Sequence, residues 1–233
     1  MLTEGRISIN GRIVKELGTR IDPDQDQVSV DGRLVSERPP LVYWMLNKPD
    51  LCLTSRAREE GKSTIFDLPS LRQVKFLLYP VGRLDYRTEG LLLLSNDGEL
   101  VHRLTHPSFK VPRTYQVIAH RRLTEEDEAK LRKGITLDDG QTQGVDLHFV
   151  QTVDMGQSRG ACYMMTVREG RNRLVRRLFE HLDNKVIRLM RYSYGDLHLP
   201  ESLKPGEYRQ LTSQEILSLK QAVGLKDGIL RSE

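Results

Sequence analysis

VGRLDYRTEGLLLLSNDGEL, residues 81–100, places an ionisable carboxylate, Asp85, shortly before a run of four leucines. The leucine run, 91–94, has the length and apolarity of a buried strand. An apolar run at 76–82, FLLYPVG, predicts a second buried strand before Asp85. We therefore expect Asp85 in a cleft, where partial burial and a charged neighbour set the reactivity of a carboxylate. The alternative is a plain turn in which Asp85 bonds to the nearby backbone.

Outward from this stretch, strand and helix patterns mix without strict alternation. Apolar or alternating segments predict strands at 41–46, 113–120, 145–153, 161–169 and 185–195. Helices are expected at 98–106, 125–133, 172–182 and 213–223. Thr124 and Asp127 resemble a capping box for the second helix, and Gly134 is a natural end for it. The pattern predicts an α+β fold with a mixed, mainly antiparallel central sheet and flanking helices.

The N-terminal segment contains a repeat. Residues 7–14 read ISINGRIV and residues 28–35 read VSVDGRLV, so each alternates and then reaches Asn-Gly or Asp-Gly, dipeptides that favour tight hairpins. This small unit carries the basic residues Arg12, Lys15, Arg20 and Arg33 but is too short to bury a core alone. It is either a hairpin layered on the main domain or part of an RNA-binding module. SERPP, 36–40, reads as a linker, so we expect domains at 1–37 and 38–233.

The composition is that of an ordinary globular protein, with 38% hydrophobic and 29% charged residues among 233. No apolar run approaches the roughly 20 residues of a membrane span, and MLTEGRISING has no apolar core of a secretory signal. Two cysteines without a C-x-x-C pair argue against a disulfide framework, so we expect a cytoplasmic protein. The net charge of +4 is only a mild bias towards polyanions.

Metal and nucleotide sites lack support in the sequence. His102 and His106 have the spacing of two zinc ligands on a helix, but Arg103 stands where a zinc protease needs glutamate. Neither glycine-rich phosphate-binding motif, G-x-G-x-x-G or G-x-x-x-x-G-K-[ST], is present. We therefore expect no metal and no nucleotide cofactor.

The basic run VREGRNRLVRRLF, residues 167–179, places arginines around a predicted amphipathic helix. Arg176 and Arg177 border its apolar stripe, Arg173 points away, and Arg168 and Arg171 lie in the preceding turn. No acidic residue follows the helix start until Glu180, so the arginines are expected to repel one another unless an anion binds. Arginines where a turn meets a helix N-terminus suit a phosphate backbone. The alternative is a solvated basic face.

Four motifs occur in order: NKP (47–49), GRLD (82–85), RTY (113–115) and EGRNRLVRR (169–177). From 41 to about 220 the chain resembles bacterial ribosomal RNA pseudouridine synthases of the RsuA type. The N-terminal segment resembles the second half of the RNA-binding module shared with ribosomal protein S-four, a partial module. Leu174, where this family usually has glutamine, and DLCLTS (50–55), where it usually has a glycine, depart from the family pattern.

The resemblance implies the pseudouridine synthase fold and isomerisation of a uridine in ribosomal RNA. It implies that Asp85 is the essential carboxylate, acting on the ribose as nucleophile or as base. It further implies that Arg176 ion-pairs with Asp85 and that Tyr115 stacks on the uracil. The RNA-binding residues implied by the motifs and the N-terminal module are Arg83, Lys48, Arg168, Arg171, Arg173, Arg177, Arg12 and Lys15.

The expected partner is ribosomal RNA, with large-subunit RNA preferred, and the expected state is a monomer without cofactor. One alternative is a non-catalytic RNA-binding or ribosome-assembly protein on the same fold, which would lack Asp85, Tyr115 or Arg176; all three are present. Another is a hydrolase of glycosidic bonds, but this class ordinarily needs two carboxylates and no motif places a second one.

Overall fold

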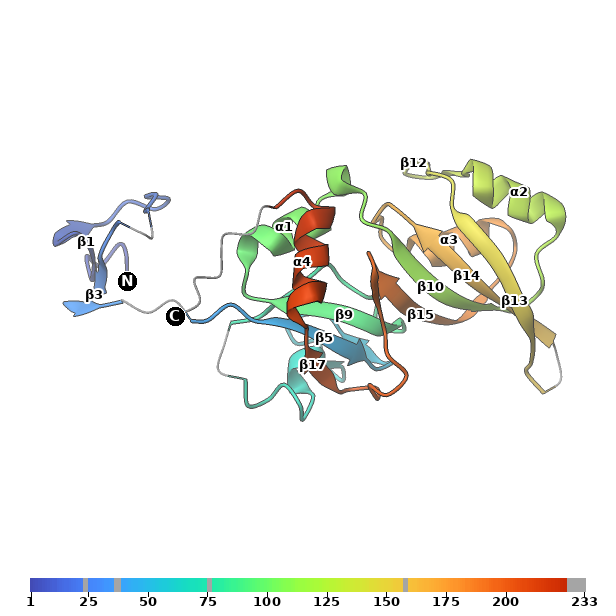
Figure 1. Cartoon of the computed structure of the whole chain (residues 1–233), viewed down its shortest axis with the longest axis horizontal. Helices are drawn as coiled ribbons and strands as arrows, with labels where there is room; N and C mark the ends of the chain where they lie inside the picture. Colours follow the sequence, from blue (N-terminus) through green and yellow to red (C-terminus); the bar gives the residue numbers. More distant parts are fainter. Residues whose placement is uncertain (23–24, 36–38, 75–76, 157–158, 226–233) are drawn as a thin grey trace. The chain divides into compact units, whose positions relative to one another are not determined.

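The computed structural model describes residues 1–22, 25–35, 39–74, 77–156 and 159–225. The chain divides into two units, Met1–Pro40 and Leu41–Glu233. Both are drawn in Figure 1, and each is described by itself. No helix among the described residues is long and apolar enough to cross a membrane.

The N-terminal unit is a four-stranded antiparallel sheet in the order β2-β1-β3-β4. Its strands are β1 (Ile7–Ile9), β2 (Arg12–Val14), β3 (Val28–Val30) and β4 (Arg33–Leu34). Both predicted hairpins are confirmed. Asn10 and Gly11 have φ of 50° and 78°, and Asp31 and Gly32 have φ of 51° and 74°, as a turn with two left-handed residues requires. None of the described residues of this unit is fully buried, which agrees with its small size.

The larger unit is built on a nine-stranded sheet with a main path β13-β14-β10-β15-β9-β5-β17. Its pairs are antiparallel except β15 with β9, so the α+β class and the mainly antiparallel sheet are confirmed. The path strands are β5 (Tyr43–Lys48), β9 (Glu89–Ser95), β10 (Arg113–Ala119), β13 (Asp146–Asp154), β14 (Arg159–Val167), β15 (Val186–Tyr194) and β17 (Tyr208–Gln210). Off this path, β8 (Tyr79–Pro80) pairs with β9 and β16 (Leu197–His198) with β15.

In the part of the chain that the structure describes, four helices flank this sheet: α1 (Gly98–Thr105), α2 (Glu125–Lys133), α3 (Leu174–His181) and α4 (Ser213–Ala222). The predicted capping box of α2 is present, and Gly134 ends that helix with φ of 95°. Smaller elements are η1 (Ile65–Asp67), η2 (Pro107–Phe109), β6 (Cys52–Leu53), β7 (Ser63–Thr64), β11 (Thr136–Leu137) and β12 (Gly140–Gln141).

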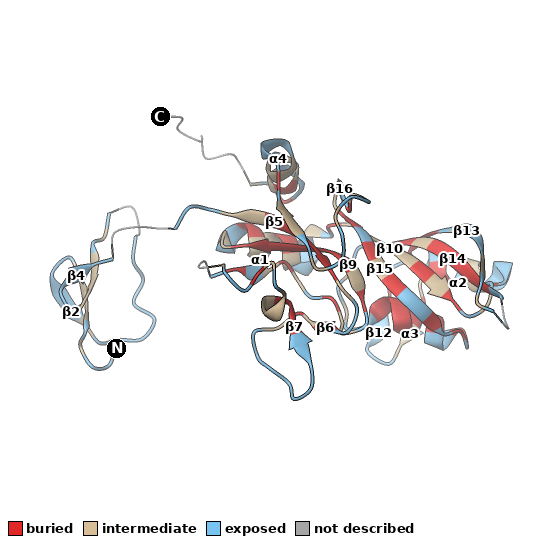
Figure 2. Ribbon diagram, turned by 90° about the horizontal axis from the view of Figure 1, so that it is seen from below, coloured by how far each residue is buried: buried red, intermediate tan, exposed pale blue. Residues whose placement is uncertain are grey.

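The run of four leucines lies in β9, an interior strand of the sheet, and is buried (Figure 2). Leu91 and Leu93 pack in one cluster with residues of α1 and α4, whereas Leu92 and Leu94 pack in another with residues before Asp85. A strand covered on both faces reads as a continuous apolar run instead of an alternating one.

The predicted strand at 76–82 is wrong in extent. Among its described residues Tyr79 and Pro80 form a two-residue ladder with β9, and the Val81 N–H adds one bond to the Leu93 carbonyl at 2.8 Å. The side chain of Leu77 is 56% exposed. Pro80 has no backbone N–H, so this segment cannot make a full ladder. Phe76 lies outside the described residues.

Strands β9 and β15 meet at a short parallel seam, with Glu89 opposite Met190 and Gly90 opposite Arg191. Gly90 has φ of 100°, and a Cβ there would lie 2.4 Å from the carbonyl oxygen of Arg191. Only glycine fits this close approach. The seam brings the segment that carries Asp85 against β15 and, through it, β10.

Candidate active site

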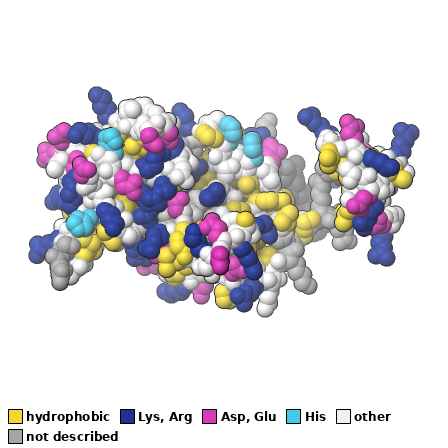
Figure 3. Space-filling view, turned by 180° about the vertical axis from the view of Figure 1, so that it is seen from behind, with side chains coloured by type: hydrophobic (Ala, Val, Ile, Leu, Met, Phe, Trp, Pro, Cys, Tyr) yellow, Lys and Arg dark blue, Asp and Glu magenta, His cyan; other side chains and the backbone are white. Residues whose placement is uncertain are grey.

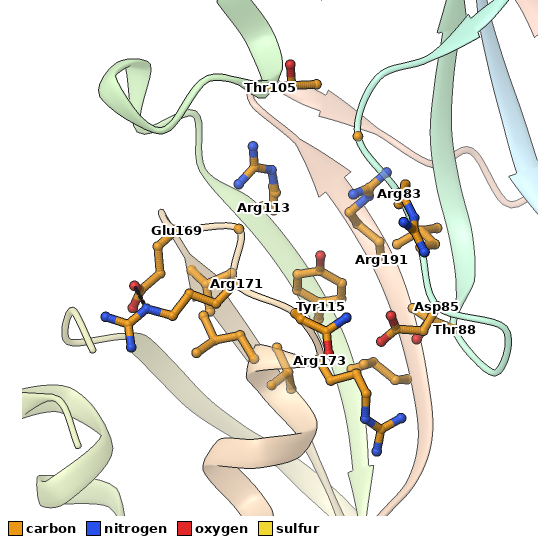
Figure 4. Close-up of a pocket in the computed structure, with 18 residues that line it drawn as sticks. Arg83, Asp85, Thr88, Thr105, Arg113, Tyr115, Glu169, Arg171, Arg173 and Arg191 are labelled. Atoms are coloured by element: carbon orange, nitrogen blue, oxygen red, sulfur yellow. Dashed lines mark ion pairs between the residues drawn. The ribbon is translucent and has the colours of Figure 1, made fainter. Parts of the chain in front are cut away.

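A cavity of about 340 Å³ opens beside this seam. It lies between the Asp85 loop (82–88), strands β10 and β15, and the turn before α3 (Figure 4). Asp85 reaches it from the loop and Tyr115 from β10, and both side chains are half-buried. Residues 30 apart in sequence thus line one cavity.

The Asp85 loop is held from several directions. The Thr88 N–H donates to the Asp85 carbonyl at 2.9 Å, and the Thr54 hydroxyl donates to the Leu84 carbonyl at 2.9 Å. The Lys48 ammonium donates to the Thr88 carbonyl at 2.8 Å and to the Pro49 carbonyl at 2.9 Å. Among the described residues, the Asp85 carboxylate itself makes no hydrogen bond or ion pair, so it is free to meet a substrate.

Lys48 was expected to contact RNA, and this prediction is wrong. Its side chain is 0% exposed because β5 carries it into the interior, behind the loop. Burial lowers the pKa of the ammonium to about 8, and the nearby thiol and carboxylates, Asp85 and Glu89 among them, limit the fall. Lys48 therefore positions the loop that carries Asp85.

Arg176 is buried, 8% exposed, but the expected ion pair with Asp85 is not formed. Its guanidinium donates instead to the carbonyls of Arg87, at 2.7 Å, and Val186, at 3.1 Å. Its Nε is buried without a partner in the described part of the chain. Burial and Arg173 lower the pKa of Arg176, while Asp85 opposes that fall and is therefore an electrostatic neighbour.

Arg191 lines the same cavity and was missed from the sequence. Its side chain is 2% exposed, its Nε donates to the Leu91 carbonyl at 2.7 Å, and its Nη2 is buried without a partner among the described residues. The guanidinium lies over the Tyr194 ring, 5.1 Å from its centroid, and Arg113 lies over the same ring at 5.2 Å. The signal in the sequence was an arginine at an inward position of the strand pattern RLMRYSYG.

Apart from Arg176, the arginines of 167–179 have acidic partners, contrary to expectation. Arg171 and Arg177 both pair with Asp139 on the hairpin β11–β12, at 3.0 and 2.7 Å, and Arg177 also pairs with Asp138. Arg168 pairs with Asp146 at 2.9 Å, and Arg173 pairs with Glu180 at 3.3 Å. Asp138, Asp139 and Asp146 are distant in sequence from the arginines that they pair with, which is why local reading missed them.

Arg83 and Arg173 are the predicted RNA-binding residues that remain exposed while lining the cavity. Arg173 stands in the left-handed region, φ 49°, at the entry to α3. Figure 3 shows Lys and Arg side chains gathered on one face of the larger unit. Arg12 and Lys15 are exposed on the N-terminal unit.

A second carboxylate, Glu169, also lines the cavity, but both of its oxygens are engaged. One pairs with Arg171 at 3.0 Å, and the other accepts the Gln143 N–H at 2.8 Å. Of the carboxylates lining the cavity, only Asp85 is unpaired within the described structure. The described residues contain no cluster of three or more His, Cys, Asp or Glu that could hold a metal ion.

Comparison with known proteins identifies the family of this chain. The family model for RNA pseudouridylate synthase matches residues 42–181. An RNA pseudouridine synthase of Aquifex aeolicus is 37% identical over 97% of this chain and 88% of its own length. Ribosomal large subunit pseudouridine synthase B of Bacillus subtilis is 35% identical over 94% and 87%. A solved pseudouridylate synthase structure matches with a TM-score of 0.66 and 34% identity, covering 94% of this chain and 90% of its own. The chain therefore belongs to the RNA pseudouridylate synthase family.

Proposed function

We propose that the protein converts one uridine of large-subunit ribosomal RNA to pseudouridine, with Asp85 as its catalytic carboxylate. The observation that carries this proposal is the unpaired Asp85 carboxylate beside Tyr115 in the cavity of about 340 Å³. The name of the Bacillus subtilis relative supports the choice of large-subunit RNA.

The reaction needs no water and no cofactor. The bond between ribose carbon 1′ and uracil N1 breaks with its electrons on uracil, and carbon 5 then bonds to carbon 1′. Carbon 5 loses its proton and N1 gains one, so the atoms balance. Asp85 acts either as nucleophile at carbon 1′ or as base at carbon 2′. A hydrolase ordinarily requires two carboxylates because one must protonate the leaving group while the other activates water or attacks; here uracil leaves as an anion.

A uridine can reach this cavity only after it leaves the base stack. Tyr115 provides an aromatic face for the extruded uracil, and its hydroxyl is available for the carbon 5 proton. Arg83 and Arg173, exposed at the cavity, would hold the phosphate backbone. Arg176, which donates to the Arg87 carbonyl, would hold the Asp85 loop in place. Its positive charge would favour the ionised form of Asp85.

The N-terminal unit, with Arg12 and Lys15, would add sequence-independent RNA affinity. We expect a monomer in the cytoplasm, where ribosomal RNA is modified.

Product analysis tests the proposal. Large-subunit and small-subunit ribosomal RNA transcripts are incubated with the purified protein, and pseudouridine and free uracil are quantified. The expected result is one new pseudouridine in large-subunit RNA, an intact chain and no free uracil. Release of uracil would indicate a hydrolase, a site in small-subunit RNA would overturn the substrate, and binding without either product would indicate a non-catalytic RNA-binding protein.

A further inference from the structure

A second cavity, of about 300 Å³, shares Asp85 and Arg173 with the first. Its other lining residues include Arg87, which is two positions after Asp85, and Lys185, which precedes β15. Asp85 therefore stands at a junction: Tyr115 lines one cavity and these cations line the other.

Three of the four cations that line the second cavity have no carboxylate partner among the described residues; the exception is Arg173. Arg87 and Lys185 are exposed, and their side chains make no ion pair or hydrogen bond to any described residue. Arg176 brings a buried guanidinium whose Nε has no partner there. By contrast, Arg168, Arg171, Arg177 and Arg188 all have carboxylate partners.

The charges in this cavity are unequal. Four cations line it, and the carboxylates that line it are Glu180, which pairs with Arg173 at 3.3 Å, and Asp85. Unpaired cations that converge beside a buried guanidinium repel one another. They favour binding of an anion with several acceptor oxygens.

We propose that the second cavity binds the phosphodiester group attached to the ribose of the target uridine. This proposal rests on the proposed function. If the uracil occupies the cavity of Tyr115 and Asp85 acts on the ribose, the backbone of the same nucleotide must continue from Asp85 into neighbouring space. The cavity lined by Arg87 and Lys185 begins there and offers the charge that a phosphate requires. Arg87 and Lys185 thereby fix the ribose relative to Asp85.

Neutralising the two unpaired cations tests the phosphate subsite. The probe is a ribosomal RNA transcript, and the variants are Arg87→Gln and Lys185→Gln. Lys133→Gln is the matched control, since Lys133 is an exposed lysine on α2 that lines neither cavity. The Arg87→Gln change leaves its carbonyl, the acceptor for Arg176, in place.

Each of the two variants should weaken transcript binding roughly 3- to 10-fold. The slope of log affinity against log salt should become shallower by about 0.7–0.9 per lost contact. The control should match the wild type. Equal affinity and slope for all four proteins would overturn the subsite, whether or not the transcript is turned over. Absence of wild-type turnover would instead contradict the proposed function.

A neutral linkage distinguishes a phosphate from a base in this cavity. Short RNAs are prepared around the mapped uridine, with a methylphosphonate at one flanking position at a time. One of these positions should weaken wild-type binding as much as Arg87→Gln does, and the two changes together should cause no further loss. Additive losses at every position would show that Arg87 meets some other group, such as a neighbouring base, and would overturn the proposal.

Discussion

Replacing Lys48 with methionine tests whether the buried ammonium holds the catalytic loop. Methionine has a similar length and is apolar, but it cannot donate to the carbonyls of Thr88 and Pro49, which Lys48 contacts at 2.8 and 2.9 Å. The Thr88 carbonyl lies three residues beyond Asp85, so the loss acts directly on the loop. Because Lys48 is fully buried, the change leaves the RNA-facing surface intact.

Two opposing free energies set the effect on stability. Each hydrogen bond from a charged donor contributes about 1.5–3 kcal/mol, so two losses cost roughly 3–6 kcal/mol. The ammonium itself is unfavourable in the interior. Its pKa falls from 10.5 to about 8. That shift corresponds to about 3 kcal/mol, which methionine recovers. At pH 7 the variant should therefore be less stable by about 0–3 kcal/mol.

The difference in the free energy of unfolding between the wild type and Lys48→Met should depend on pH. Between pH 8 and 10.5 the unfolded chain keeps the Lys48 proton while the folded chain loses it. The free energy of unfolding of the wild type, relative to Lys48→Met, should therefore rise with pH in this window, by up to about 3 kcal/mol. Below pH 8 the lysine is charged in both states and the difference should be constant.

The assay combines urea unfolding, RNA titration and single-turnover pseudouridine formation, with Lys133→Met as the exposed control. A loop displaced by about 1 Å should slow turnover roughly 10- to 100-fold, while RNA affinity stays within about two-fold. Unchanged turnover would refute the positioning role. Weakened RNA binding with full turnover would instead indicate that Lys48 contacts RNA, as the sequence predicted.

Further expectations follow from the cavity and the sheet. Tyr115→Phe should keep RNA affinity and lose turnover, whereas Tyr115→Leu should lose both, with stacking contributing roughly 1–3 kcal/mol of binding; a fully active Phe variant would limit Tyr115 to stacking. Gly90→Ala should destabilise by about 2–4 kcal/mol in urea unfolding, because its Cβ would lie 2.4 Å from the Arg191 carbonyl, whereas Gly98→Ala meets nothing within 4 Å and should be tolerated. Arg177 holds the pKa of Asp139 down to about 2, so the stability that Asp139→Asn removes should be present above pH 4 and vanish as pH falls through 2. If that loss persisted below pH 2, the Asp139 ion pairs would not be its cause.

Patterns that act over a few residues predicted much of the fold. The Asn-Gly and Asp-Gly hairpins, the cap of α2 and the strand of four leucines all depend on neighbours in sequence, and all are confirmed. The cleft position of Asp85 is also confirmed, although its basis was partly wrong. A short bridge at Tyr79 and Pro80, with Leu78 and Val81 buried nearby, replaces the strand expected before it.

Contacts between segments that are distant in sequence could not be predicted from such local patterns. Asp139 neutralises Arg171 and Arg177 from 32 and 38 positions away, so the arginine run appeared unpaired when read locally. Lys48 stands at the end of a strand whose register turns it inward, and Arg191 is buried because it faces the seam with Gly90. For Lys48 and Arg191 the strand itself was predictable from the sequence. The packing partners that decide what each side chain does were not.

Asp85→Asn tests the central claim most directly. Asparagine keeps the size of the side chain but cannot act as nucleophile or base. The measurement is single-turnover formation of pseudouridine on a ribosomal RNA transcript, with a binding titration and thermal unfolding of the same samples. We expect a folded protein that binds RNA within about two-fold of the wild type and forms no detectable pseudouridine. Isomerisation above a trace would contradict the catalytic role, and loss of folding would show that Asp85 serves the structure of the loop instead.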